Sequence, residues 1–252
     1  MCTNYVPSTR QELAAQHLGV LELPYEDWPD EVYPGYLAPI LLLGGSAAAD
    51  AAGAAKQLQC RLARFGLVPR WCKNDAQARD ISRKTYNARS ETAFEKPSFR
   101  EPWAERQWAL VPMRHFFEPC WEAAAGQNAR AVRWQIGLAD QRNFAVAGLW
   151  ERWEHAADGA VRESFTLLTV NADGHALMGR MHKPGEEKRM PVIVPANSYM
   201  AWLQATPQSA SNWLQAWPAE QMQGHPAPRA MFGTSPALAP ATSTAGQNLS
   251  LF

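Results

Sequence analysis

Five segments between residues 108 and 195 carry the pattern of β-strands, and they constrain the fold more than any other feature. All are rich in β-branched and aromatic residues and are separated by turn residues: WALVPMRHFFE (108–118), AVRWQIGL (131–138), NFAVAGLWERW (143–153), RESFTLLTV (162–170) and MPVIVP (190–195). Two earlier stretches, PILLL (39–43) and CRLARFGLVPRW (60–71), indicate further strands. A chain with this many strand segments is expected to build one large, curved sheet.

Short helices are predicted on both sides of these segments. STRQELAAQHLGV (8–20) offers Ser8 and Thr9 as N-cap residues, with glutamine and glutamate three residues further on. NSYMAWLQA (197–205) reads as a second helix, with Asn197 as its N-cap. The order of a helix, many strands and a helix predicts an α+β fold with a curved, pseudo-barrel mixed sheet and flanking helices.

The chain shows no internal repeat and no linker before about residue 225. Residues 73–97 have little periodicity and predict a loop crossed by short helices, and 98–107 predict another short helix. We therefore expect a single β-rich domain over residues 2–225. Residues 226–252 are dense in Pro, Ala, Ser and Thr, which predicts a tail that is mostly flexible.

Composition narrows the class of protein. Among 252 residues, 46% are hydrophobic and 19% are charged, which is typical of a globular protein. Lys plus Arg and Asp plus Glu both number 24, so any basic groove for a nucleic acid has to be local. No signal-peptide pattern is visible, and the apolar stretch 37–45 is too short to span a bilayer. We expect a monomeric, cytoplasmic protein that does not enter membranes.

The four cysteines predict neither a metal site nor a disulfide framework. No CxxC pair or Cys/His cluster has the spacing of a zinc site, and we expect no cofactor. Cys60, Cys72 and Cys120 are expected to be buried or incidental thiols.

Cys2 stands directly behind the initiator methionine. Removal of Met1 would give Cys2 a free α-amine with a pKa of about 8 beside a thiol with a pKa of about 8.5. Such an aminothiol condenses with an aldehyde to an imine, and the thiol then closes a thiazolidine ring. The same residue could serve as the nucleophile of an amidohydrolase. On Cys2 alone, an ordinary small residue near a terminus is the simplest interpretation.

The stretch YNARSETA (86–93) places an amide, a guanidinium and a carboxylate at two-residue spacing. If the segment is extended, Asn87, Arg89 and Glu91 face the same way. Arg89 is then suited to a forked contact with a phosphate. A surface loop whose polar groups pair with one another is the alternative.

Glu118 and His182 are the other candidates for proton transfer. Glu118 ends an apolar run, so it lies either at a sheet edge or partly buried, and burial would raise its pKa. His182 stands in a basic loop before a strand, and histidine is the usual proton shuttle near neutral pH.

Taken in order, these segments resemble the SOS response-associated peptidase (SRAP) family over roughly residues 2–205. The resemblance rests on Cys2 followed by NARSET, LVPMRHFFE, FAVAGLWE and MHKPGEEKRMPVIV. It implies a DNA-damage protein that senses abasic sites in single-stranded DNA. Mature Cys2 would form a thiazolidine crosslink with the ring-opened sugar, with lyase-like chemistry and autopeptidase removal of Met1. A cytoplasmic location at the nucleoid follows from the same resemblance.

The resemblance also implies roles for four side chains. Asn87 would position the cysteine amine and the sugar, and Glu118 would accept or relay protons at the amine. His182 would assist sugar ring opening and, in reverse, release of the crosslink. Arg89 would bind a phosphate.

Further DNA contacts follow from the same comparison. Trp71, in FGLVPRW, would stack against bases and act as a wedge at a junction of single- and double-stranded DNA. Phe65 stands where the family usually has tryptophan and is expected in the core. Pro34 would line the site, and Lys96 and Arg100 would continue the phosphate track.

Two features depart from the family pattern. Thr3 and Asn4 follow Cys2 where the family usually has glycine and arginine, so a DNA contact is missing. The loop KPGEEK (183–188) looks like an insertion after His182. Its glutamates, Glu186 and Glu187, lie near the expected path of a polyanion and are expected to tune binding.

The chain ends in GQNLSLF, which is similar to the short peptides that bind bacterial sliding clamps. The residues that would bind are Gln247, Leu249, Leu251 and Phe252, with Asn248 as an extra residue after the glutamine. The alternative is that this end packs on its own domain.

Two other functions stay open at this point. One is a peptidase or amidohydrolase with an N-terminal cysteine, in which Asn87 helps to stabilise an oxyanion. The other is a non-covalent single-stranded DNA-binding module recruited to a sliding clamp.

Overall fold

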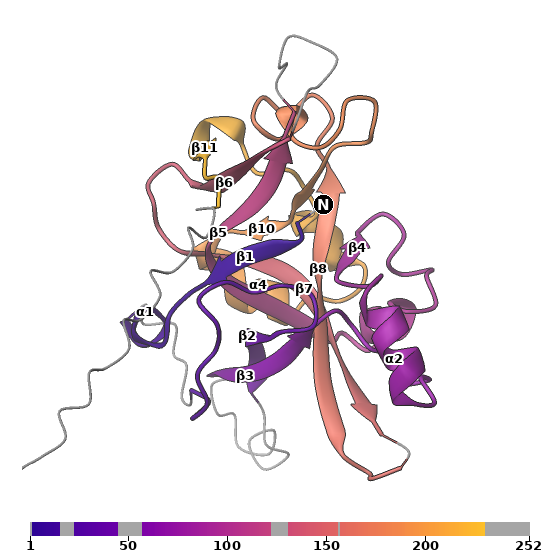
Figure 1. Cartoon of the computed structure of the whole chain (residues 1–252). Helices are drawn as coiled ribbons and strands as arrows, with labels where there is room; N and C mark the ends of the chain where they lie inside the picture. The colour runs from indigo at the N-terminus through magenta and orange to yellow at the C-terminus, as the bar shows by residue number, and fades with distance from the viewer. Residues whose placement is uncertain (1, 16–22, 45–56, 122–130, 156, 230–252) are drawn as a thin grey trace, which may run out of the picture.

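Five strands close into a ring at the centre of the protein (Figure 1). The structure, a computed structural model, describes residues 2–15, 23–44, 57–121, 131–155 and 157–229. In ring order the strands are β5 (Trp108–Cys120), β7 (Phe144–Glu154), β8 (Val161–Asn171), β3 (Gln57–Phe65) and β2 (Leu37–Gly44), which returns to β5. β3 and β8 run parallel and the other neighbours antiparallel, so the ring is a small mixed barrel. The predicted β-rich fold with a mixed pseudo-barrel sheet is confirmed.

Shorter strands extend the ring at its margins. β1 (Asn4–Pro7) and β6 (Val132–Leu138) pair with β5, and β11 (Met222–Pro226) pairs with β6. β4 (Asn87–Arg89) and β9 (Arg189–Pro191) both pair with β8, whereas β10 (Ile193–Val194) pairs with β7. These added strands place Asn87 and Arg89, on β4, beside β8, and through β1 they bring the start of the chain to β5.

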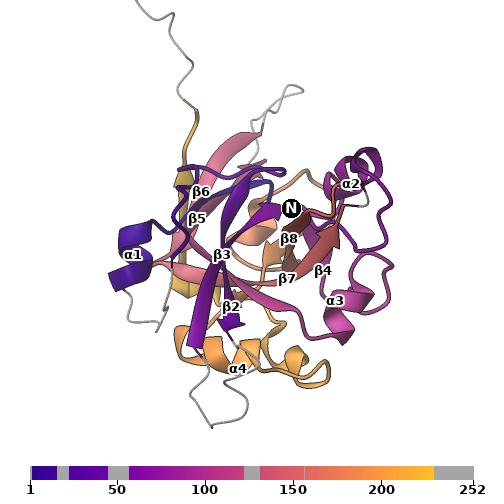
Figure 2. The same cartoon turned by 90° about the horizontal axis from the view of Figure 1, so that it is seen from below.

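The helices are short and lie around the sheet, as the view from below shows (Figure 2). They are α1 (Arg10–Ala15), α2 (Asp75–Ser82), α3 (Arg100–Ala104) and α4 (Tyr199–Leu203), with 3₁₀ turns at Met178–Arg180, Ala196–Ser198, Ser209–Trp213 and Ala219–Gln221. Thr9 and Glu12 form the predicted capping box, with Thr9 N donating to Glu12 Oε2 at 2.7 Å. The prediction that Asn197 caps the last helix is wrong: a 3₁₀ turn precedes α4, whose N-cap is Ser198 without a side-chain bond.

Aromatic packing inside the barrel supports the wall below the candidate site. Phe65 is fully buried and stacks on Phe165, with ring centroids 5.2 Å apart. The edges of Tyr5 and Tyr86 pack against the same ring at 5.6 and 5.9 Å. Phe65 is therefore a core residue, as predicted. The next residue, Gly66, has φ +111°, and a Cβ there would lie 2.4 Å from Ser82 O, so the turn requires glycine.

The predictions on the C-terminal tail and on membrane spans can be compared only with the residues that the structure describes. The clamp-like peptide and most of the predicted tail fall within residues 230–252, outside the described ranges. Among the residues that the structure places, no helix is long and apolar enough to cross a membrane.

Candidate active site

The pairing of β1 with β5 brings the start of the chain to Glu118. Asn4 lies opposite Phe117 in an antiparallel register, so the residues before Asn4 run toward Glu118 and Pro119. Cys2 is fully buried in the chain that still carries Met1, and its Sγ lies 3.5 Å from Asn4 O. Burial, with the Glu118 carboxylate adding, raises the pKa of the Cys2 thiol far above its usual value. The sulfur is therefore a thiol at neutral pH.

Asn87 joins Cys2 across 85 residues of sequence. β4 runs parallel to β8, with Asn87 opposite Leu167, and this register points the buried amide into the site. Its Nδ2 donates a hydrogen bond to Cys2 O at 2.8 Å. The amide thus holds the backbone of the cysteine in place.

Glu118 and His182 form a buried acid–base pair. Glu118 Oε2 and His182 Nε2 are 3.3 Å apart, and the exposed fractions of the two residues are 1% and 8%. Burial raises the pKa of Glu118 to about 7. Burial, with the Lys188 ammonium adding, lowers the pKa of His182 to about 4. The alternative of an exposed carboxylate at a sheet edge is wrong, because Glu118 lies within a covered stretch of β5.

The backbone at His182 is strained. His182 has φ +61°, a left-handed conformation that residues other than glycine rarely adopt. Its N–H donates to Pro119 O at 2.7 Å, and Lys188 Nζ donates to His182 O at 3.0 Å. The first of these bonds ties the backbone of His182 to β5, and the second ties it to Lys188. Strained residues of this kind concentrate at functional sites.

Two tyrosines line the same region, and the sequence analysis did not select them. Burial raises the pKa of Tyr86, and the charges of Glu118 and Cys2 add to the shift. Burial also raises the pKa of Tyr5, with Cys2 contributing. No local pattern marks either residue, because the pairings of β1 with β5 and of β4 with β8 place them here.

The four gathered groups suit proton transfer and nucleophilic addition. A neutral imidazole, a carboxyl group that ionises near pH 7, a thiol and a positioning amide meet in one buried place. All four cysteines are free and buried. Within the described ranges, no group of three His, Cys, Asp or Glu residues is arranged to hold a metal ion.

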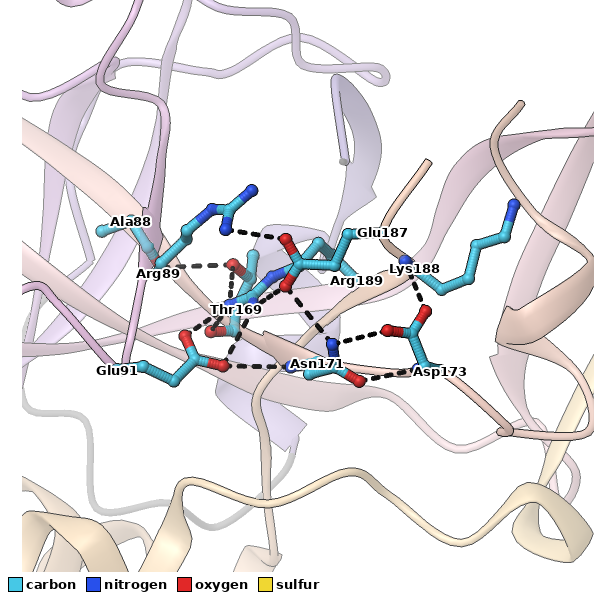
Figure 3. A network of polar contacts seen from close by, with 9 residues as sticks. All are labelled: Ala88, Arg89, Glu91, Thr169, Asn171, Asp173, Glu187, Lys188 and Arg189. Atoms are coloured by element: carbon cyan, nitrogen blue, oxygen red, sulfur yellow. Dashed lines mark hydrogen bonds and ion pairs between the residues drawn. The ribbon is translucent and has the colours of Figure 1, made fainter. Parts of the chain in front are cut away.

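Arg89 belongs to a polar network at the edge of the site (Figure 3). Its Nη1 pairs with Glu187 Oε2 at 2.7 Å, while Glu187 Oε1 pairs with Arg189 Nη1 at 2.7 Å. Arg189 is buried and receives Glu91 in a forked contact at 2.7 and 2.9 Å. Arg189 Nη2 also donates to Thr169 O at 2.7 Å. Asn87 thus contacts Cys2, whereas Arg89 and Glu91 belong to this ion-pair network.

Three other predicted DNA contacts lie in or against the segment 96–100. Trp71 is 40% exposed, and its indole Nε1 donates to Pro97 O at 3.2 Å, beside the exposed Lys96. Arg100 lines an open groove of about 950 Å³ that Glu91 also lines. The structure therefore places Arg100 and the Arg89 network along one surface, with Trp71 held to the segment between them.

The turn around Pro34 reaches the site through Asn4. Tyr36 N donates to Tyr33 O at 3.0 Å around the partly exposed Pro34, and Asn4 Nδ2 lies 3.4 Å from the Tyr33 hydroxyl. The amide of Asn4 also donates to Glu31. A buried amide thus stands where the family resemblance places a DNA-binding arginine.

Arg133 supplies a cation near Asn4, and no sequence pattern indicated it. Its guanidinium pairs with Glu31 and lies over the ring of Phe117, 3.3 Å from the centroid. The signal is tertiary, because β6 places Arg133 opposite Pro119.

Comparison with known proteins shows which families and proteins this chain is similar to. The family profile described as "SOS response associated peptidase (SRAP)" matches residues 1–232. The abasic site processing protein YoqW of Bacillus subtilis is 32% identical over 165 residues, which cover 64% of this chain and 66% of YoqW. The abasic site processing protein HMCES of Pongo abelii is 29% identical over 132 residues, covering 43% of this chain and 36% of HMCES.

Solved structures agree at the level of the fold. A crystal structure of a Bordetella bronchiseptica protein has a TM-score of 0.76 and 29% identity, covering 90% of this chain and 99% of that one. A Bacteroides thetaiotaomicron protein has a TM-score of 0.73 at 23% identity, covering 89% of this chain and 91% of its own. The latter likeness concerns the fold alone.

Proposed function

Because the chain belongs to the SOS response-associated peptidase (SRAP) family, we propose that it captures abasic sites in single-stranded DNA through a covalent bond to Cys2. One observation carries the proposal: Cys2, Asn87, Glu118 and His182 meet in one buried place although they are spread over 181 positions of sequence. The names of the relatives support the substrate, since YoqW and HMCES are both called abasic site processing proteins.

The first chemical step joins nitrogen to carbon. After Met1 is removed, the neutral α-amine of Cys2 attacks the aldehyde carbon of the ring-opened sugar, and water leaves as the imine forms. Asn87, bonded to Cys2 O, keeps the amine directed at the sugar. His182 assists opening of the sugar ring, and Glu118 accepts and returns protons around the amine, a task that suits a pKa of about 7.

The second step closes the ring. The Cys2 thiol adds its sulfur to the imine carbon, and its proton moves to the nitrogen, which gives a thiazolidine. The raised pKa of the thiol favours this order, because a protonated sulfur is a poor nucleophile whereas about half of the amine is neutral at pH 8. Aldehyde and aminothiol together lose one water.

Denaturing electrophoresis tests the proposal. The wild-type protein is mixed with a single strand that carries one abasic site and with the same strand intact. We expect a denaturation-resistant adduct with the abasic strand alone, and none with Cys2→Ala. An adduct of equal yield in Cys2→Ala would contradict the proposal.

A peptidase with Cys2 as its nucleophile is the second candidate, and the family description favours it. The amide of Asn87 bonds the carbonyl of Cys2 itself, not that of the Met1–Cys2 peptide. This position suits orientation of the cysteine better than an oxyanion site for Met1 removal. Cys2-dependent turnover in a broad peptide screen would support this candidate, and its absence would count against it.

Two partner predictions extend the proposal. Trp71 is exposed enough to meet a base pair where a single strand joins a duplex. Recruitment to a sliding clamp by residues 247–252 stays a prediction. Deletion of those residues should abolish clamp binding and leave crosslinking to a free oligonucleotide unchanged.

A further inference from the structure

Arg89 and Arg189 flank one strand and differ in how tightly they are held. β4 and β9 both pair with β8, and the two arginines lie beside Thr169 and Asn171. Arg189 is 3% exposed and has Glu91, Glu187 and Thr169 as partners. The Arg89 side chain is 53% exposed, and Glu187 is its one ion-pair partner among the described residues. The Arg89 pair is therefore the weaker of the two.

Glu187 has other partners to retain if Arg89 leaves it. Its Oε1 accepts from Arg189 at 2.7 Å and from Asn171 Nδ2 at 3.3 Å, whereas its Oε2 pairs with Arg89 (Figure 3). Hydrogen bonding from Arg189, with the charge of Arg89 adding, lowers the pKa of Glu187, so the carboxylate is charged at neutral pH. Release of Arg89 would leave Glu187 anchored, with its single negative charge still compensated by Arg189.

We propose that Glu187 competes with DNA for Arg89. When a strand binds, a phosphate displaces the Glu187 carboxylate from the Arg89 guanidinium. The inference rests on the proposed function, since it assigns Arg89 to the DNA backbone. A forked contact of a phosphate with Arg89 that uses Nη1 requires the donor that Glu187 Oε2 occupies, so the two anions compete for that donor. Glu187 then lowers the affinity for every strand by a fixed factor. Lasting capture is left to the covalent step at Cys2, which intact DNA does not undergo.

The neighbouring glutamate provides a matched control. Glu186 lies in the same loop and carries the same charge, but it is exposed and has no ion pair within the described residues. If the loop glutamates acted only through their long-range charge, Glu186→Gln and Glu187→Gln would change the DNA affinity equally. Direct competition at Arg89 makes only Glu187→Gln effective.

Equilibrium binding to an intact single-stranded oligonucleotide tests the inference without crosslinking. We expect Glu187→Gln to bind about 2–5-fold more tightly than wild type at low salt, as an exposed ion pair allows. The slope of log K against log salt should steepen, because the phosphate then displaces a bulk anion from Arg89. Glu186→Gln should move the affinity much less, and Arg89→Ala/Glu187→Gln should bind like Arg89→Ala. Thermal melting confirms that each variant is folded.

Different outcomes would overturn this inference and the proposed function on which it rests. Equal effects of Glu186→Gln and Glu187→Gln, or a gain that survives in the Arg89→Ala background, would overturn the competition at Arg89. Failure of the wild-type protein to crosslink abasic DNA would overturn the proposed function, whatever Glu187→Gln does.

Discussion

Two pairs of an acidic and a basic side chain lie at opposite ends of the loop 182–189. Their surroundings differ, and so does their state of charge. At one end, Glu118 and His182 are buried 3.3 Å apart, and burial shifts both pKa values toward the neutral forms. At the other end, Glu187 and Arg89 are 2.7 Å apart at the surface, where the carboxylate keeps its charge. Burial makes the first pair suited to proton transfer, and exposure makes the second suited to exchange with another anion.

An arginine near the site is therefore not necessarily free to bind an anion. In the Arg89 network two arginines meet two glutamates, so the local charge sums to zero. Near Asn4, the single Glu31 is shared by Arg133 and Arg229, at 3.9 Å from the latter, so positive charge remains. The pair of Glu118 and His182 should respond to pH, whereas the pair of Glu187 and Arg89 should respond to salt.

The largest effect is expected from Glu118→Gln. Loss of a positioned proton-transfer group should slow crosslinking by about 10²–10⁴-fold, with affinity for intact DNA unchanged. Single-turnover adduct formation measures the rate. Glu151→Gln is the matched control, since Glu151 is 1% exposed but pairs with Arg70 outside the site. Comparable slowing in Glu151→Gln would show that loss of any buried carboxylate suffices.

The pH dependence of stability tests the burial of the same residue. Glu118 has a pKa of about 7 in the fold, above the usual value of 4.5. Its contribution to stability is therefore fully present below pH 4.5 and is lost as the pH rises through about 7. His182, with its lowered pKa, is neutral across this window. Melting curves from pH 5 to 8 should show wild type losing stability relative to Glu118→Gln, and parallel curves would contradict the assignment.

Arg89→Ala should act on salt dependence and not on pH. We expect affinity for single-stranded DNA to fall about tenfold at low salt, and the salt slope to decrease by about 0.7, as for one lost phosphate contact. The crosslinking rate at saturating DNA should stay unchanged. Arg152→Ala is the control, because Arg152 is similarly exposed at 56% and also pairs with a glutamate. An equal loss of affinity in both variants would remove Arg89 from the DNA path.

The smallest effect is expected from Glu91→Gln. Glu91 is 46% exposed, so solvent screening limits its pair with Arg189 to about 0.5–1 kcal/mol of unfolding free energy. Urea unfolding measures the change, and the profile of stability between pH 5 and 8 should keep its shape, because the pKa of Glu91 is lowered from 4.5 and the group stays charged in that range. A loss of several kcal/mol would mean that the buried Arg189 depends on Glu91 far more than on Glu187 and Thr169.

Local patterns predicted the strands and the acid–base candidates, because alternation and composition act over a few residues. The strand over 108–118 became β5, and Glu118 is buried as one of the two alternatives required. Closure of the ring depends on the parallel pairing of β3 with β8, which no local pattern encodes.

What the sequence could not reveal follows from contacts between distant segments. Arg89 and Glu187 are 98 positions apart, and their ion pair exists because β4 and β9 share β8. The positions of Tyr86 and Arg133 are tertiary in the same way. The Asn197 cap failed for a local reason, since a 3₁₀ turn competes with the first turn of α4.

Intact-mass spectrometry of the protein before and after mixing with an abasic single strand is the decisive test of capture through Cys2. We expect loss of Met1, and then an adduct equal to protein plus oligonucleotide minus one water that survives denaturation. Cys2→Ala should give no such species. A wild-type protein that has lost Met1 yet forms no adduct, or an adduct of the same mass relation in Cys2→Ala, would contradict capture through Cys2.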